Sequence, residues 1–381
     1  MDIAQEMFTD DPFQYLDKEP LGKSNSEVWK VAREPGGTVY ARKEFLAPKC
    51  EDKERIDKIR KEIRNMAKVK HHHIVELCGT HYIQNTQTVG LLLLPVADMN
   101  LTEFFYRLDR KQYSTSDQEL KARMIMCQWP PCLFQAMDYL HDAGFRHKDI
   151  KPSNILIKGD SVYLADFGIS NNFRDATTSK TEGQPGANTK RYIAPEIYNE
   201  LPRGRASDIW ALGCTVLEIC TVATGQNTIG DLTDHLRQGQ THPPTSFCRS
   251  PYLVFDWIFM LLACPGEDDW CKRRIQKMLQ LAFLMLDPNP HTRISARQLV
   301  DLLNKRGSNN FHSVGKLACE ECKRTSHVPL HNFPLHSVFK EDENGGIYVP
   351  TRKQISRETH DLWEEVKRRW LESHIWWNFT A

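Results

Sequence analysis

The chain has 381 residues, of which 40% are hydrophobic and 26% charged, and its formal net charge is +1. This length exceeds most single compact cores, and the composition is that of a globular protein rather than a disordered one. The near-zero charge gives no electrostatic reason to expect binding to nucleic acid or to a membrane surface.

Two features of the chain bear on its location. Eleven cysteines are too few and too spread out for a disulfide scaffold, so we expect a reducing compartment, cytoplasmic or nuclear. The acidic N-terminus has no signal-peptide pattern, and the longest apolar stretch, Tyr252 to Cys264, is 13 residues, too short for a bilayer. We therefore expect no membrane insertion.

Residues 13–95 have the pattern of a β-rich segment interrupted by one charged helix. Glu27–Ala32 and Thr38–Phe45 are rich in β-branched and aromatic residues, and Ile74–Cys78 and Val89–Leu94 are also strand-like. Between these pairs, residues 50–70 repeat apolar side chains every three or four positions. This spacing predicts an amphipathic helix with a buried stripe formed by Ile56, Ile59, Ile63, Met66 and Val69.

Three successive histidines, His71 to His73, follow this helix. A metal site is one interpretation of such a run. Adjacent residues converge on one ion with difficulty, however, so a turn is the simpler interpretation.

The pattern becomes helical from residue 120 onward, most clearly in AMDYLHDAG, SDIWALGCTVLEICTV and RRIQKMLQLAFLMLD. Thr224–Pro251 is richer in Gly, Gln, Thr and Pro and reads as a loop-dominated connection, and Gly307–Asn310 reads as a linker. We predict an α+β protein with a short extension (1–12), a β-rich lobe (13–95), a larger helical lobe (96–305) and a tail (306–381).

The most informative stretch runs from His147 to Asn154 (HKDIKPSN), followed twelve residues later by Asp166-Phe167-Gly168. Phosphoryl transfer needs Mg²⁺ on the phosphates, an in-line hydroxyl and cations that absorb charge. Asp149 can accept the proton of the attacking hydroxyl, and Lys151 can reach the transferring phosphate. Asn154 and Asp166 offer the hard oxygen ligands that Mg²⁺ takes.

These motifs resemble those of the eukaryotic protein kinase family, from about residue 13 to about residue 305. The resemblance implies a two-lobed kinase fold, ATP and Mg²⁺ as cofactors, and a protein substrate. Lys43 resembles the lysine that contacts the α- and β-phosphates. Glu62 resembles its ion-pair partner, with Glu54 as a competing candidate. The resemblance makes His147 a structural residue.

Further residues resemble the family's ATP site. Leu94 to Val96 resemble the hinge that bonds adenine, with Asp98 or Asn100 near the ribose, although Asp98 could instead cap the following helix. Gly22, Ser24 and Val28 lie in the phosphate loop, LGKSNSEV. This loop departs from the family because serines stand near the second and third glycine positions, which puts ATP affinity or turnover in doubt.

The family's activation segment is expected between Asp166 and Glu196. Its hydroxyl-bearing candidates for phosphorylation or substrate contact are Thr177, Thr178, Ser179, Thr181 and Thr189. The resemblance makes Glu196, Asp208 and Arg293 structural. Lys148 replaces the usual arginine, so control by loop phosphorylation is expected to be weaker.

The sequence therefore predicts an ATP-dependent protein kinase. Lys151, together with Thr189, resembles the serine/threonine branch of the family. The alternative is a catalytically weak or inactive kinase-like scaffold, which the altered glycine loop favours. The hinge and the Tyr40–Lys43 strand are similar to kinases of filamentous fungi.

The tail contains Cys319, Cys322, His327 and His331, a C-x2-C-x4-H-x3-H arrangement. It is either a zinc site or a surface loop with reduced cysteines, and Pro329 and the absence of a second cysteine pair favour the loop. Ser356–Trp377 reads as an amphipathic helix whose aromatic face we expect to dock on the rest of the chain.

Overall fold

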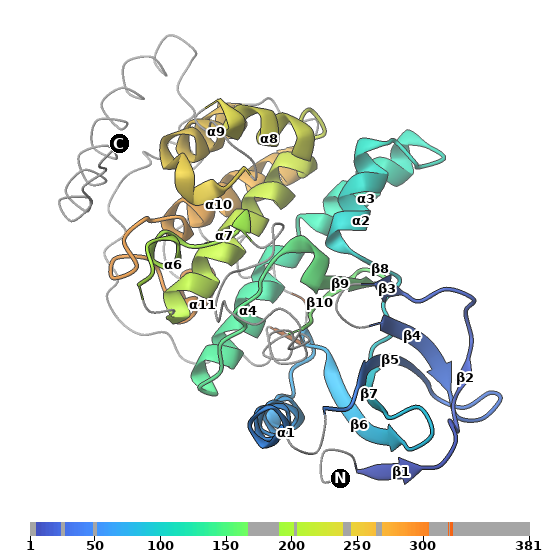
Figure 1. The fold of residues 1–381 in the computed structure, drawn as a ribbon. Helices are drawn as coiled ribbons and strands as arrows, with labels where there is room; N and C mark the ends of the chain where they lie inside the picture. Colours follow the sequence, from blue (N-terminus) through green and yellow to red (C-terminus); the bar gives the residue numbers. More distant parts are fainter. Residues whose placement is uncertain are drawn as a thin grey trace. The chain divides into compact units, whose positions relative to one another are not determined.

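The structure is a computed structural model that describes residues 5–23, 27–48, 52–166, 190–201, 204–238, 245–263, 269–304, 319 and 321–322 (Figure 1). These residues form two compact units. The β unit contains the described residues up to Leu101, Asp142–Asp149, and Ser153 to Asp166. The helical unit contains Thr102–His141, Ile150–Pro152 and the described residues from 190 onward.

The main sheet of the β unit has seven strands, ordered β1-β6-β7-β5-β4-β2, with β3 paired to β4 (Figure 1). Its strands are β1 (Glu6–Phe8), β2 (Gln14–Tyr15), β3 (Gly22–Lys23), β4 (Glu27–Ala32), β5 (Val39–Leu46), β6 (Glu76–Ile83) and β7 (Thr88–Leu94). Val31, Val89 and Leu91 are fully buried in it. The predicted strands are thus confirmed, and Gly36, with φ of +75°, makes the turn between β4 and β5.

The N-terminal extension contributes a strand that the sequence analysis missed. Strand β1 runs parallel to β6, with Glu6 opposite His81. The Asp11 carboxylate accepts two hydrogen bonds from the Arg42 guanidinium, at 2.7 and 2.8 Å. This extension therefore covers an edge of the sheet, where unpaired backbone groups would otherwise be exposed.

The predicted charged helix is α1 (Lys53–Lys68), which packs on β6. Ile59, Ile63 and Met66 are buried, as is Val69 just after the helix. Ile56 is only partly buried. The apolar stripe is therefore confirmed over most of its length.

A second sheet joins three short strands, β8 (Met99–Asn100), β9 (Ile155–Lys158) and β10 (Ser161–Leu164). Ile74 forms a parallel bridge to Leu164, whose N–H donates to the carbonyl oxygen of His73 across 2.8 Å. The His73 side chain donates through Nδ1 to the carbonyl oxygen of Val162 across 2.7 Å. These bonds tie the segment between Asn154 and Asp166 to the start of β6.

The helical unit is built around α7 (Arg205–Ala223), whose residues from Ser207 onward are all buried. Its other helices are α2 (Leu101–Asp109), α3 (Ser116–Met126), α4 (Trp129–Asp142), α6 (Pro195–Tyr198), α8 (Ile229–Arg237), α9 (Pro251–Ala263), α10 (Asp269–Met285) and α11 (Ala296–Asn304). A side chain at Gly213 would lie only 2.8 Å from Met285, so this glycine permits the close packing of α7 on α10.

Helix α7 is also the one described helix long and apolar enough to cross a membrane by length and composition. In the structure, 94% of that apolar window is buried inside the protein. The apolar character of α7 is therefore accounted for by its position in the protein core.

The predicted fold class is confirmed, because a β-rich unit is followed by a helical one. One expectation was wrong: Thr224–Pro251 contains helix α8. The Thr228 hydroxyl accepts from the N–H of Asp231 and the Asp231 carboxylate accepts from the N–H of Thr228, while Leu232 and Leu236 are fully buried. This capping box and apolar pair outweigh the loop-like composition. The tail helix predicted at 356–377 lies outside the described residues.

Candidate active site

The loop after α4 places Asp149 and Asn154 side by side. A 3-10 turn, Pro152–Asn154, leads into β9 and turns the Asn154 side chain back along the chain. Its amide nitrogen donates to the carbonyl oxygen of Asp149 across 2.7 Å and to the Asp149 carboxylate across 2.9 Å. Asn154 is buried and Asp149 is partly exposed. The asparagine therefore fixes a carboxylate that solvent can still reach.

The backbone of this loop is held by His147, which is fully buried. Its Nδ1 accepts a hydrogen bond from the Asp149 N–H at 3.4 Å. Between them, Lys148 has a φ of +71°, a left-handed conformation that costs a residue with a Cβ about 1–3 kcal/mol. His147 thus has a geometric role in orienting Asp149.

Strand β5 carries Lys43 into contact with Asp166. The ammonium of Lys43 lies 2.5 Å from Oδ1 of Asp166, and the side chains are 5% and 34% exposed. Asp166 also has a left-handed backbone, with φ of +61°. Glu62, the expected partner of Lys43, lies on α1, but its side chain is outside the described residues, as is that of Glu54. Among the described side chains, the partner of Lys43 is Asp166.

The two pairs of side chains are neighbours along the backbone. The N–H of Ala165 donates to the carbonyl oxygen of Asn154 across 2.9 Å, so Asp166 begins next to Asn154. The site therefore collects two carboxylates, one amide and one ammonium. Lys151, two residues after Asp149, is partly exposed.

The hairpin of β3 and β4 places Gly22 opposite Val28, and β5 places Lys43 on the other side of Val28. A side chain built at Gly22 would meet no atom within 4 Å, and its φ is not left-handed. The protein itself therefore does not require glycine here. Ser24 lies outside the described residues.

The residues expected in the hinge follow β7. Leu94, at the end of this strand, and Val96 are partly buried. The Asp98 carboxylate accepts from the Lys158 ammonium across 2.7 Å and from the Gly159 N–H across 2.8 Å. The lysine and then the backbone N–H hold the pKa of Asp98 below its ordinary value. Asp98 is therefore bonded to the turn between β9 and β10, and its described bonds do not cap α2.

The residues expected to be structural form buried contacts within the helical unit. The Arg293 guanidinium donates to both oxygens of Glu196 at 2.8 and 2.9 Å, and the Ser207 hydroxyl donates to Glu196 across 2.8 Å. Burial alone would raise the pKa of Glu196, but these donors outweigh it and hold the pKa below its ordinary value. The Asp208 carboxylate lies 3.0 Å from His141 Nε2.

Sequence reasoning missed a second buried network. Glu218, 1% exposed on α7, accepts from the Arg191 guanidinium across 3.0 Å and from the Tyr192 hydroxyl across 2.9 Å. Burial raises the pKa of Glu218 against the opposing effect of Arg191. The sequence does contain a signal for this network, because the apolar run CTVLEIC includes one glutamate. A glutamate buried with such a run needs a cation nearby to offset its charge.

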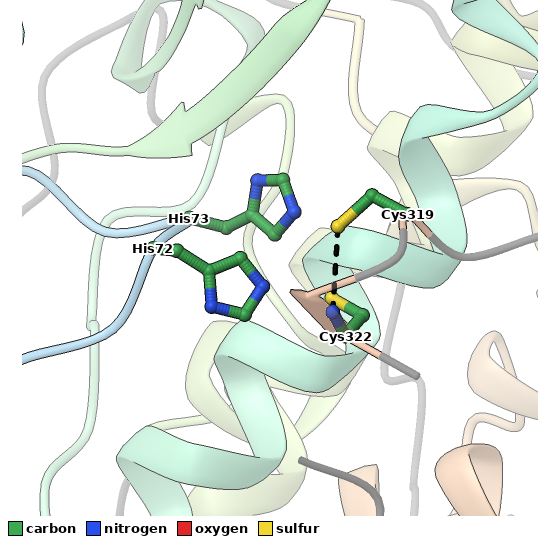
Figure 2. Close-up of side chains that lie close together, drawn as sticks. All are labelled: His72, His73, Cys319 and Cys322. Carbon is green, nitrogen blue, oxygen red and sulfur yellow. Dashed lines mark hydrogen bonds between the residues drawn. The ribbon is translucent and has the colours of Figure 1, made fainter. Parts of the chain in front are cut away.

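Two other predicted groups are described only in part. Cys319 and Cys322 are described, and the Cys322 N–H donates to the sulfur of Cys319 across 3.4 Å (Figure 2). Cys322 is fully buried, so the surface-loop interpretation is wrong for this residue. The following candidates lie outside the described residues: Thr177, Thr178, Ser179, Thr181, Thr189, His327 and His331.

The chain matches the family model of the protein kinase domain over residues 15–302. It is similar to the G2-specific protein kinase fin1 of Schizosaccharomyces pombe, with 29% identity over 52% of this chain and 29% of the relative. Serine/threonine-protein kinase 10-A of Xenopus laevis is 24% identical over 92% of this chain and 35% of the relative. CBL-interacting protein kinase 15 of Oryza sativa subsp. japonica is 28% identical over 87% of this chain and 76% of the relative. The chain thus spans about a third of the length of the first two.

Proposed function

Because the chain belongs to the protein kinase family, we propose that it transfers the γ-phosphoryl group of ATP to a serine or threonine hydroxyl of a protein. The observation that carries this proposal is the joined arrangement of Asp149 with Asn154 and of Lys43 with Asp166. Phosphoryl transfer depends on positioned charges, which is what this set provides.

Asp149 is the group that orients the attacking hydroxyl and takes its proton. Its carboxylate is held by Asn154 and its backbone by His147, and it is partly exposed to substrate. Lys151 follows on the same loop and supplies positive charge to the transferring phosphate. A lysine at this position also supports serine/threonine over tyrosine specificity, as does Thr189.

The donor set fits Mg²⁺, which when bound neutralises the charge that develops on the phosphates. Asn154 donates through its nitrogen to Asp149, so its carbonyl oxygen is the atom suited to a cation. Asp166 offers a second hard oxygen. Lys43 holds Asp166 in place and carries the positive charge for the α- and β-phosphates.

The ATP site continues along the strands that flank Lys43. Val28 packs next to it in the sheet, and Gly22 leaves open space beside the backbone, which suits an approaching phosphate. Ser24 belongs to the same loop, and Glu62 is the further partner proposed for Lys43. Leu94 and Val96 offer backbone groups to adenine. Asp98 reaches the ribose only if it shares its bonds with Lys158.

A transfer assay with the full chain tests this function. Purified protein is given radiolabelled ATP, Mg²⁺ and a peptide library, and phosphoserine and phosphothreonine are expected among the products. Asp149→Asn should lower transfer at least about a hundredfold. Asp117→Asn, at an exposed position of α3, is the matched control and should leave transfer unchanged. Phosphotyrosine as the main product would overturn the specificity, and no wild-type transfer would favour the scaffold alternative.

Four further expectations complete the proposal. The protein is cytoplasmic or nuclear, the activation-segment hydroxyls Thr177 to Thr181 include an autophosphorylation site, and residues 356–377 dock on the kinase domain. The similarity of the protein to kinases of filamentous fungi remains a prediction.

Intact-mass measurement of wild type against Asp149→Asn tests the modification. Deletion of the tail after residue 304, with thermal unfolding as the measurement, tests the docking.

A further inference from the structure

Three cysteines of the helical unit are not among the residues of the site described above. Cys132 is in the first turn of α4 and is only 4% exposed. Cys322 is fully buried, and Cys319 is partly exposed. None of the three is in a disulfide.

The geometry of Cys319 and Cys322 suits a metal ion. The residues are three positions apart, and Cys322 begins to follow a helical path that lets its N–H donate to the sulfur of Cys319 across 3.4 Å (Figure 2). Structural zinc sites use two cysteines at this spacing.

A third sulfur reaches the same place from α4. The thiol of Cys322 is hydrogen-bonded to the thiol of Cys132, so residues far apart in the chain bring three sulfur atoms together. Thiols that coordinate a divalent cation lose their protons on binding, so each of the three would bind the ion as a thiolate.

We propose that Cys132, Cys319 and Cys322 bind one Zn²⁺ as thiolates, with a histidine as the fourth ligand. Binding releases one proton from each thiol and fastens the start of the tail to α4. Thiolates are soft ligands that favour zinc over magnesium, so this ion is distinct from any cofactor of phosphoryl transfer. The site needs none of the residues of the candidate active site.

The fourth ligand is a neutral imidazole, since a structural zinc is tetrahedral. His327 and His331 are the candidates from the tail sequence. Single alanine variants at these two positions identify the ligand.

Metal analysis of the full chain tests the proposal. Protein purified without chelators and dialysed against metal-free buffer should retain about one zinc per chain. Cys132→Ser, Cys319→Ser and Cys322→Ser should each lose most of it. Cys271→Ser is the matched control, because this thiol is also buried and bonded to another thiol, Cys127, and should keep its zinc. Circular dichroism establishes that each variant is folded.

Cobalt substitution keeps the proposal open to refutation if a serine variant fails to fold. The wild-type protein with Co²⁺ in place of zinc should show tetrahedral d–d bands and thiolate-to-cobalt charge transfer with the intensity of three sulfur ligands. Absence of bound metal, with all thiols reactive after denaturation, would overturn the proposal. A disulfide, seen as a loss of two reactive thiols, would overturn it too, as would zinc that survives Cys132→Ser.

Discussion

Two ion pairs in this protein have similar chemistry but different surroundings. Lys43 pairs with Asp166 through one ammonium at 2.5 Å, and the Asp166 side chain keeps 34% of its surface exposed. Arg293 pairs with Glu196 through two parallel bonds, and these side chains are 0% and 4% exposed. The first pair is open to a charged ligand that could share its partners, whereas the second is closed and can serve only the fold.

Replacing each cation by methionine turns this comparison into an experiment. Lys43→Met should lower phosphoryl transfer at least about a hundredfold, because the phosphates lose a positioned positive charge. Its free energy of unfolding should change by no more than about 1 kcal/mol, since water still reaches Asp166. The measurements are radiolabel transfer and urea denaturation. Near-normal turnover of Lys43→Met would refute the role proposed for this lysine.

For Arg293→Met we expect the main effect on the free energy of unfolding rather than directly on phosphoryl transfer. It leaves the Glu196 carboxylate buried without its guanidinium, and losing one partner of a buried pair costs about 3–5 kcal/mol of folding free energy. Urea denaturation measures this loss. The double variant Arg293→Met, Glu196→Leu should recover part of it, because no buried charge remains. An unchanged denaturation midpoint for the single variant would show that Glu196 is satisfied without the arginine.

The β unit offers a third, smaller effect through His81. This imidazole is 1% exposed, with the Phe13 ring 4.8 Å and the Phe8 ring 6.2 Å away. Burial, followed by the charge of Arg42, lowers the pKa of His81 to about 4. The imidazole of His81 therefore stays neutral in the folded protein at pH values below about 6.5, where it is protonated in the unfolded chain.

Stability from His81 should be complete above pH 6.5 and fall as the pH drops toward 4, by up to about 3 kcal/mol. Urea denaturation across this range measures the loss. His81→Leu should reduce the slope, and the difference between the two proteins isolates this residue from Asp11 and Glu196, whose lowered pKa values also cost stability in acid. Equal slopes would show that His81 is protonated without penalty in the folded protein.

The features that could be read from the sequence were those with local signals. The stripe from Ile59 to Val69 has helical spacing, and the strands β4 and β5 have a glycine turn between them. The candidate catalytic residues from Asp149 to Asp166 lie in one short stretch, so their spacing alone was enough to predict phosphoryl transfer.

The features that were missed depend on contacts between distant residues. The sequence around Cys132 does not indicate that its thiol is bonded to the thiol of Cys322, which lies 190 positions later in the chain. Glu218 pairs with Arg191, which lies outside the helix of Glu218. Strand β1 is positioned by its pairing with β6. Composition misled where a short cap outweighed it, as in α8.

The smallest expected effect tests that cap. Thr228→Ala removes the hydroxyl that accepts from the Asp231 N–H at 3.2 Å, and it should cost about 1 kcal/mol of unfolding free energy. Thr228→Ser is the matched control and should cost much less, because serine caps equally well. Urea denaturation compares the three proteins. If Thr228→Ala equals wild type, burial of Leu232 and Leu236 alone forms α8, and the capping box is a consequence of the helix rather than a cause.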